Sequence, residues 1–252
     1  MGTAGPDAPS PWEPRARLRH HHRNGPPSPW DRGPAGRRSG AADMEVYKML
    51  LPFALALLVR YQYGLPEQPP DQLKMFFRFL PVLVLIILIL ENHRGNDFSL
   101  RLVSGMGFAG AGDVCLLYKE QHLNHSIICF WLGYCMLTVA FGLKLDNALL
   151  GAAIGAVAAV AYLVLQPTVR GVNQVMALAY LLAALLMIWR AAAWWKNSRH
   201  RSSTSAMCGT IALATSNLIL PTHVFNFPVP HNQFLVTSFY YTGQLLIAVS
   251  SL

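Results

Sequence analysis

From Met44 to its end, the chain alternates apolar runs with short polar links. Several runs approach the 17–25 residues that span a bilayer. Because lipid offers backbone groups no hydrogen-bond partners, such runs must be helical. We therefore predict an all-α integral membrane bundle of about eight transmembrane helices. The predicted spans are Val46–Leu65, Leu73–Leu90, Leu102–Tyr118, Ser126–Leu143, Ala148–Leu165, Val172–Trp195, Ala206–Leu220 and Phe234–Leu252.

Composition supports a membrane protein over a soluble helical protein. Of 252 residues, 53% are hydrophobic and 13% are charged, whereas soluble chains are about 25% charged. Eight apolar helices would leave too little polar surface to coat a soluble core. The net charge is +8, but the basic residues lie in the first residues and in the links, not among aromatic residues on a folded domain. This placement excludes nucleic acid as an expected partner.

Residues 1–43 differ from the remainder and predict a disordered N-terminal tail rich in Pro, Gly and Arg, followed by a membrane domain at residues 44–252. The run His20–His22 allows weak metal binding, although a solvated tail explains it equally simply. The tail has no apolar segment typical of a signal peptide. Met44 directly precedes the first apolar run and is an alternative start.

The basic residues also predict the orientation of the chain. With eight spans, both termini share a side with the second, fourth and sixth links. That side carries fifteen Lys and Arg residues, against four or five on the other side. Cytosolic links are enriched in Lys and Arg, so we expect both termini in the cytosol. We expect a multi-pass protein of the endoplasmic reticulum or another endomembrane.

A faint internal repeat has an offset of 104 residues. This offset aligns Gly105-x4-Gly110-x-Gly112-Asp113 with Gly209-x4-Ala214-x-Ser216-Asn217. Small residues face small residues, and such stripes let membrane helices approach closely. Two halves of four spans each would be parallel repeats. Chance similarity between apolar helices is the alternative.

Asp113 is the one carboxylate that lies well inside a predicted span. A charge near the bilayer centre costs roughly 2.5–3.5 kcal/mol on insertion scales, so it requires a partner, a cavity or a function. The glycines before Asp113 clear space beside it. The structural alternative is a hydrogen bond to Asn217 or to a tyrosine. Asn217 lies at equivalent depth in the seventh span, where a lone asparagine commonly joins helices.

The last span carries a second polar stripe. Tyr240 and Gln244 are four residues apart and share a helical face, and Tyr241 lies too deep for an interfacial belt residue. The link Pro221–Gln233 before this span is either a rigid surface segment or a lid over a lipid-facing cavity.

The cysteines predict no further chemistry. They lie inside apolar runs without CxxC or zinc spacing, and we expect no disulfide, no metal and no cofactor. These cysteines are Cys115, Cys129, Cys135 and Cys208.

These motifs resemble the lysoplasmalogenase (YhhN-like) membrane family, with the greatest likeness to its animal members. Gly112-Asp113-Val114-Cys115-Leu116 resembles the family's Gly-Asp-x-x-Leu motif, and Arg78-Phe79-Leu80-Pro81 its basic-x-Leu-Pro signature. Trp189-Arg190 matches, as do Phe227-Pro228-Val229-Pro230 and the final stretch from Tyr240 to Ile247. The likeness covers about residues 46–252.

The resemblance implies an eight-span fold that hydrolyses the vinyl-ether bond of lysoplasmalogens, without a cofactor. The products would be a fatty aldehyde and a glycerophospho-ethanolamine or -choline. Asp113 would protonate the alkene carbon, because an acid in an apolar cavity can hold its proton near neutral pH. We expect Asn217 to take part in catalysis, and Tyr134, Tyr240, Tyr241, Gln244 and Arg78 to bind substrate. The expected partners are lysoplasmalogen or a related lysophospholipid and membrane lipids.

The chain departs from the family pattern at two positions. Asn217 stands where the family has Asp, and Tyr134 aligns with a His that precedes Ala140-Phe141-Gly142. Asn cannot take a proton from water, and Tyr, with an ordinary pKa of about 10, is a poor base. The base of the reaction is therefore in question. An inactive lipid-binding or regulatory protein of the same fold is the alternative to a hydrolase, and a transporter is a third reading.

Overall fold

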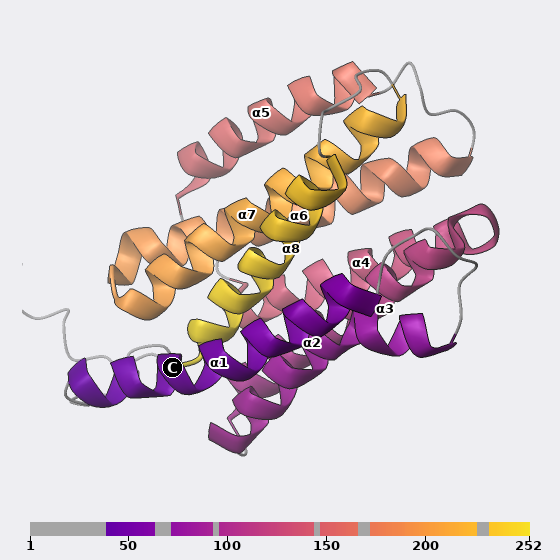
Figure 1. The fold of residues 1–252 in the computed structure, drawn as a ribbon. Coiled ribbons are helices and arrows are strands. Elements are labelled where there is room, and N and C mark those ends of the chain that lie inside the picture. Colours follow the sequence, from indigo (N-terminus) through magenta and orange to yellow (C-terminus); the bar gives the residue numbers. More distant parts are fainter. Residues whose placement is uncertain (1–38, 64–71, 93–95, 144–146, 166–171, 226–231) are drawn as a thin grey trace, which may run out of the picture. The chain divides into compact units, whose positions relative to one another are not determined.

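A computed structural model describes residues 39–63, 72–92, 96–143, 147–165, 172–225 and 232–252. These residues form eight α-helices and one short 3₁₀ helix, and no strand occurs among them (Figure 1). Residues 42–252 belong to one compact unit. The elements are α1 (Ser39–Tyr63), α2 (Gln72–Asn92), α3 (Asp97–Cys115), η1 (Leu116–Tyr118), α4 (Lys119–Phe141), α5 (Ala148–Leu165), α6 (Val172–Ser198), α7 (Arg201–Phe225) and α8 (Asn232–Val249).

The structure confirms the all-α membrane bundle, with one helix for each predicted span. Four stretches are long and apolar enough to cross a membrane, and α5 and α8 contain shorter apolar helices. A full crossing by every helix stays a prediction. The four stretches are Gln72–Asn92, Asp97–Tyr118, His122–Phe141 and Gln174–Ser198.

Large apolar side chains cover the outer faces of α1 and α5. Leu51 and Leu58 on α1 are exposed, as are Leu149 and Val157 on α5. A soluble protein rarely exposes continuous apolar faces of this kind. Such faces are suited to contact with lipid.

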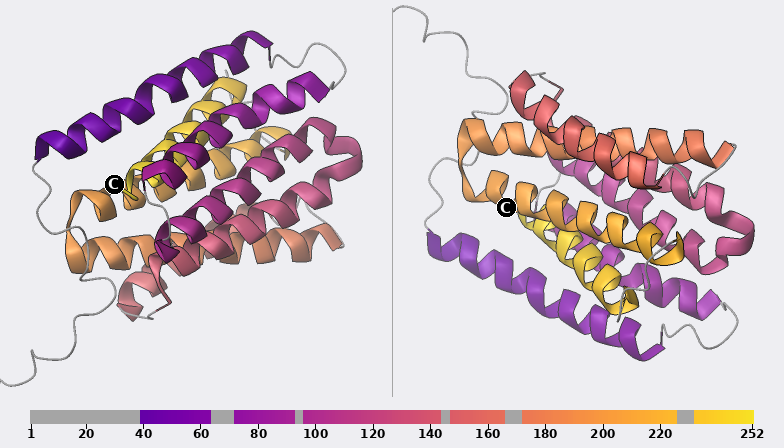
Figure 2. Two further views of the ribbon diagram at one scale, coloured as in Figure 1. Left: turned by 90° about the horizontal axis from the view of Figure 1, so that it is seen from below. Right: turned by 90° about the horizontal axis from the view of Figure 1, so that it is seen from above.

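Six helices pack in a closed order that positions the site. α2 packs on α3, α3 on α4, α4 on α6, α6 on α7, α7 on α8, and α8 on α2. α5 lies outside this ring against α6, as Figures 1 and 2 show. The ring encloses fully buried apolar side chains from five of its helices: Leu85, Leu102, Leu137, Leu213 and Ile247.

Two glycine contacts support the predicted repeat. A Cβ on Gly105 would lie 3.0 Å from the Gly133 carbonyl oxygen, and one on Gly209 would lie 2.9 Å from that of Gly243. The same Cβ atoms would meet Leu137 and Ile247, each at 2.8 Å. The α3–α4 and α7–α8 pairs therefore approach through matching glycines, and α4–α6 and α8–α2 are the matching junctions between the halves.

Several predicted boundaries differ from the helices, and two of these differences affect the predicted link and tail. α7 continues to Phe225, so the link predicted from Pro221 begins inside a helix. Residues 226–231, which hold the Pro-rich part of that link, lie outside the described residues. α1 begins at Ser39, within the segment predicted as tail, and residues 1–38 also lie outside the described residues. Disorder of the tail stays a prediction.

Candidate functional site

Asp113 lies in the last turn of α3 and is buried, with 7% of its surface exposed. Arg78 of α2 donates from Nη2 to Asp113 Oδ1 at 2.8 Å. Arg60 of α1 has its Nη2 at 3.9 Å from Asp113 Oδ2. An acid in an apolar cavity was expected from the sequence; instead, the carboxylate pairs closely with one guanidinium and lies near a second.

Tyr241 of α8 completes the surroundings of Asp113. Its hydroxyl lies 3.0 Å from Asp113 Oδ2 and 2.9 Å from the Arg78 carbonyl oxygen, and its single proton is donated to one of them at a time. The Arg60 guanidinium carbon lies 4.5 Å from the centre of the Tyr241 ring. The hydrogen bond from a tyrosine to Asp113 is therefore present, as one reading of the sequence expected.

The glycines before Asp113 have a different use from the one expected. A Cβ on Gly110 would lie 2.6 Å from Phe79, and one on Gly112 would lie 3.0 Å from Phe130. The expected clear space is therefore filled by aromatic rings. These glycines let α2 and α4 approach α3 closely, and this packing holds Asp113 in place.

Asn217 belongs to a second polar group. Its amide nitrogen donates to the Tyr134 hydroxyl, which lies 3.5 Å from the Tyr180 hydroxyl. Tyr134 is fully buried. Among the described residues no hydrogen bond joins Asn217 to Asp113, so direct contact of these two side chains has no support. A site shared by both stays a prediction.

Aromatic rings connect the two polar groups. Phe130 lies 6.4 Å from Tyr134 and 6.3 Å from Tyr240, measured between ring centres. Tyr240 in turn lies 4.9 Å from Tyr241. The chain thus brings Asp113 and Asn217 to two ends of one cluster.

The cluster contains buried polar atoms without ordinary partners. Gln244 is fully buried and Tyr240 is 5% exposed. Within the described part of the chain, neither the Tyr240 hydroxyl nor either amide atom of Gln244 forms a hydrogen bond of normal geometry, although the two side chains lie near each other. Buried polar groups are normally bonded to protein or water. These atoms are therefore suited to bind water or substrate.

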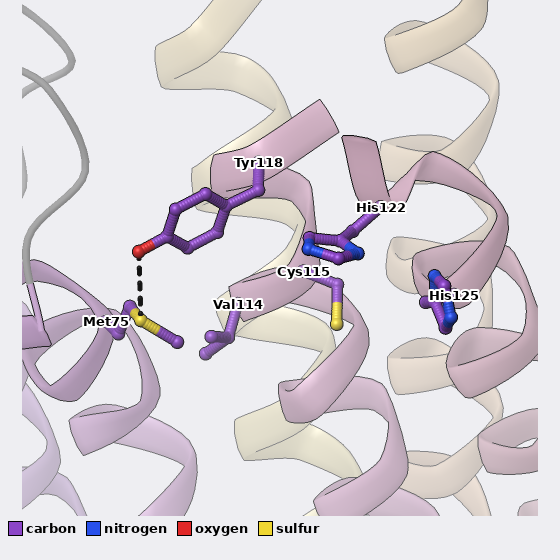
Figure 3. A pocket seen from close by; sticks show the side chains of 6 residues that line it. All are labelled: Met75, Val114, Cys115, Tyr118, His122 and His125. Atoms are coloured by element: carbon purple, nitrogen blue, oxygen red, sulfur yellow. Dashed lines mark hydrogen bonds between the residues drawn. The ribbon is translucent and has the colours of Figure 1, made fainter. Parts of the chain in front are cut away.

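A pocket of about 390 Å³ opens beside the site, at the end of α3 that carries Asp113 (Figure 3). The Tyr118 hydroxyl donates to the Met75 sulfur at 3.4 Å on one side of this pocket. His122, where the α4 backbone is kinked, packs edge-on against His125 at 5.2 Å. The lining residues are Met75, Val114, Cys115, Tyr118, His122 and His125.

The sequence did not predict a role for Arg60, for Tyr180 or for this pocket. Arg60 lies near the far end of the first predicted span. A second intramembrane charge near Asp113 was the available signal.

All four cysteines are free thiols. Among the described residues, no group of three or more His, Cys, Asp or Glu side chains could hold a metal ion.

Comparison with known proteins identifies the family. The YhhN family matches residues 73–251, which is most of the chain. The chain belongs to the YhhN family. This YhhN region contains Arg78, Asp113, Asn217 and Tyr241, whereas Arg60 lies before it.

Several relatives extend the YhhN match over most of both chains. The chain is 30% identical to pig "Lysoplasmalogenase TMEM86B", over 86% of this chain and 92% of the relative. It is 26% identical to human "Lysoplasmalogenase TMEM86A", over 80% and 88%, and 28% identical to human "Lysoplasmalogenase TMEM86B", over 88% and 96%. No solved structure matches this YhhN protein.

Proposed function

We propose that this YhhN chain is a lysoplasmalogenase: it hydrolyses the vinyl-ether bond of alkenyl-glycerophosphocholine or -glycerophosphoethanolamine. The names of the relatives support this activity. The observation that carries it is Asp113, the one buried carboxyl among the described residues. It lies beside aromatic rings and unpartnered polar atoms in a bundle suited to a lipid substrate.

The reaction consumes one water. A proton adds to the alkene carbon remote from the ether oxygen, and the adjacent carbon becomes an oxocarbenium ion. Water adds to this ion and passes a proton to the carboxylate left by the acid, which restores the acid and gives a hemiacetal. The hemiacetal collapses to a fatty aldehyde and releases the glycerol hydroxyl. Charge develops on the oxocarbenium ion, so a nearby carboxylate stabilises the transition state.

Asp113 is the acid in this proposal. Arg78 and Tyr241 fix its two oxygens, and a protonated carboxyl keeps acceptor capacity for both donors. After proton transfer, the restored carboxylate regains its ion pair with Arg78 and faces the oxocarbenium ion. General acid catalysis of this kind typically contributes about 10²–10⁴ in rate.

The water has two candidate sets of partners. Asn217 is already bonded to Tyr134, and it positions water only if this bond shifts. Among the described residues the amide of Gln244 forms no hydrogen bond of normal geometry. It can both donate to water and accept from it, and Tyr240 lies one helical turn away on the same face. Gln244 is therefore the stronger candidate for holding the water, with Asn217 and Tyr134 beside it.

The chain is an integral membrane protein, and the proposal places it in the endoplasmic reticulum or another endomembrane. A substrate that is itself a membrane lipid reaches such a site by lateral diffusion. Cell fractionation with organelle markers tests this compartment.

The test of the activity is hydrolysis by the purified chain in D₂O. Protonation at carbon should place one deuterium next to the carbonyl of the released aldehyde, which mass spectrometry detects. The saturated 1-O-alkyl analogue should give no aldehyde. If the folded chain releases no aldehyde from the alkenyl substrate with either head group, the hydrolase proposal is wrong. The chain would then be a non-catalytic lipid-binding protein.

A further inference from the structure

Among the residues that the structure describes, the charges around Asp113 do not balance. Arg60 and Arg78 carry two positive charges against the single carboxylate. The side chains of these two arginines are 14% and 23% exposed, so solvent reaches them poorly. A mostly buried cation is costly unless it is paired. One bound anion would therefore balance the charges of this site.

Arg60 is the less satisfied of the two arginines. Its distance of 3.9 Å from Asp113 exceeds a hydrogen bond, and its Nε is buried without a hydrogen-bond partner among the described residues. It also lies over the face of Tyr241, with its guanidinium carbon 4.5 Å from the ring centre. A guanidinium has five N–H donors and can bind a phosphate in a two-pronged arrangement.

The position of Arg60 suits the head group of a membrane lipid. It lies in the last turn of α1, and Arg78 lies in the second turn of α2, which follows it in the chain. Both therefore lie towards one end of the bundle and not at its middle. The Nε of Arg78 is likewise buried and unpartnered within the described residues. Two donors are thus available beside the proposed acid.

We propose that Arg60, assisted by Arg78, binds the phosphate of the substrate's head group. This assignment rests on the proposed function, because it takes the lysophospholipid as the ligand. The phosphate and the vinyl ether are attached to the same glycerol, so an anchor next to Asp113 fixes the alkene at the acid. The arriving anion also neutralises the surplus positive charge that holds Asp113 as a carboxylate. Phosphate binding would therefore favour the protonated acid and select phospholipids over neutral ethers.

Binding is measured with saturated ethers, which contain no bond for the enzyme to cleave. The probes are 1-O-hexadecyl-glycerophosphocholine and 1-O-hexadecylglycerol, titrated into the purified chain in a maltoside detergent without lipid. Charge-assisted hydrogen bonds contribute enough for at least about a tenfold preference. We expect the phosphate-bearing probe to bind at least about ten times more tightly.

The variants assign that preference to Arg60. Arg60→Gln should abolish it, and Arg60→Lys should keep part of it because the charge remains. Arg199→Gln is the matched control, because Arg199 also lies over an aromatic ring, that of Trp195 at 5.6 Å. Arg199 differs from Arg60 in being exposed and in lying beyond the opposite end of the bundle. This control should keep the full preference.

Three results would overturn the assignment. The first is an unchanged preference in a folded Arg60→Gln variant. The second is displacement of the phosphate probe by an equal amount of diacyl phosphatidylcholine, which would make bulk lipid the source of the phosphate. The third result concerns the unaltered chain, so it does not depend on the folding of any variant. Millimolar glycerophosphocholine should compete with the probe, and failure to compete would contradict phosphate binding by Arg60.

Turnover separates this inference from the proposed function. With alkenyl substrates, Arg60→Gln should raise KM for the glycerophospho-lipid and leave KM for 1-alkenylglycerol unchanged. If the unaltered chain cleaves neither substrate but prefers the phosphate probe, the hydrolase proposal fails and the anchor stands. If it cleaves both with equal KM, the hydrolase stands and the anchor fails.

Discussion

The Tyr241 hydroxyl and Asp113 Oδ2 lie 3.0 Å apart, although the two residues are separated by 128 positions in the sequence. This bond joins α8 to α3, and the same hydroxyl lies 2.9 Å from the Arg78 carbonyl oxygen on α2. One phenol therefore links three helices at the buried carboxyl. Its position suggests that Tyr241 orients the proposed acid without itself reacting.

Tyr241→Phe should lower kcat by roughly tenfold and lower the stability of the bundle by about 1 kcal/mol, the usual size of an interhelical hydrogen bond in membranes. The ring that packs on Arg60 is retained. Turnover and unfolding in detergent measure the two effects. Tyr118→Phe, which removes only a weak contact to the Met75 sulfur, is the control and should change both values less. Wild-type turnover in Tyr241→Phe would show that the hydroxyl does not position Asp113.

Gly209→Ala should destabilise the bundle by about 1–3 kcal/mol, because the added methyl would overlap Ile247 at 2.8 Å and the Gly243 carbonyl at 2.9 Å. Gly155→Ala on α5 is the matched control, since nothing lies within 4 Å of its added Cβ. Alanine also favours helix over glycine, so Gly155→Ala should leave stability equal or slightly higher. Equal unfolding midpoints for the two variants would contradict the close α7–α8 contact.

Asn217→Asp should raise turnover, because a carboxylate restores a base beside Tyr134. General-base catalysis is typically worth about 10²–10⁴ in rate. Asn217→Leu, which offers neither base nor hydrogen bond, should show no gain. Expression and gel filtration must accompany the assay, because a second carboxylate in the bundle risks unfolding it. A folded but unaccelerated Asn217→Asp variant would remove Asn217 from the catalytic residues.

Topology is tested with glycosylation tags. A tag in the link before α8, at residues 226–231, should be modified, whereas one at the N-terminus should not, since the Lys and Arg bias predicts that both termini face the cytosol. Modification only at the N-terminus would reverse the orientation and place the Asp113 end of the bundle on the cytosolic side.

The helices were largely predictable because hydropathy marks them directly. The α5 prediction matches at both ends, Ala148 and Leu165. The α4 helix instead begins at Lys119, well before the predicted Ser126, with a kink at His122. Helical hydrogen bonding continues through the polar residues before Ser126, and hydropathy gives no signal for such residues.

The residues of the candidate site were easier to predict from the sequence than the contacts among them, and their roles stay predictions. An intramembrane Asp is costly, so Asp113 was identified from the sequence alone. The depth of a residue in a helix does not fix the direction of its side chain, however. For this reason the sequence paired Asp113 with Asn217 by depth, whereas Asp113 bonds Arg78 and Tyr241, and Asn217 bonds Tyr134. Arg60 was missed because an arginine near the end of a span is ordinarily explained by the interface.

Turnover of lysoplasmalogen by Asp113→Asn tests the proposed mechanism most directly. An amide keeps the size of the side chain but cannot deliver the proton, so aldehyde release should fall by at least about 10²-fold. Asp97→Asn, an exposed change at the start of the same helix, should retain full activity. The proposal predicts a folded, inactive Asp113→Asn beside an active Asp97→Asn. Aldehyde release at the wild-type rate from a folded Asp113→Asn variant would contradict Asp113 as the acid.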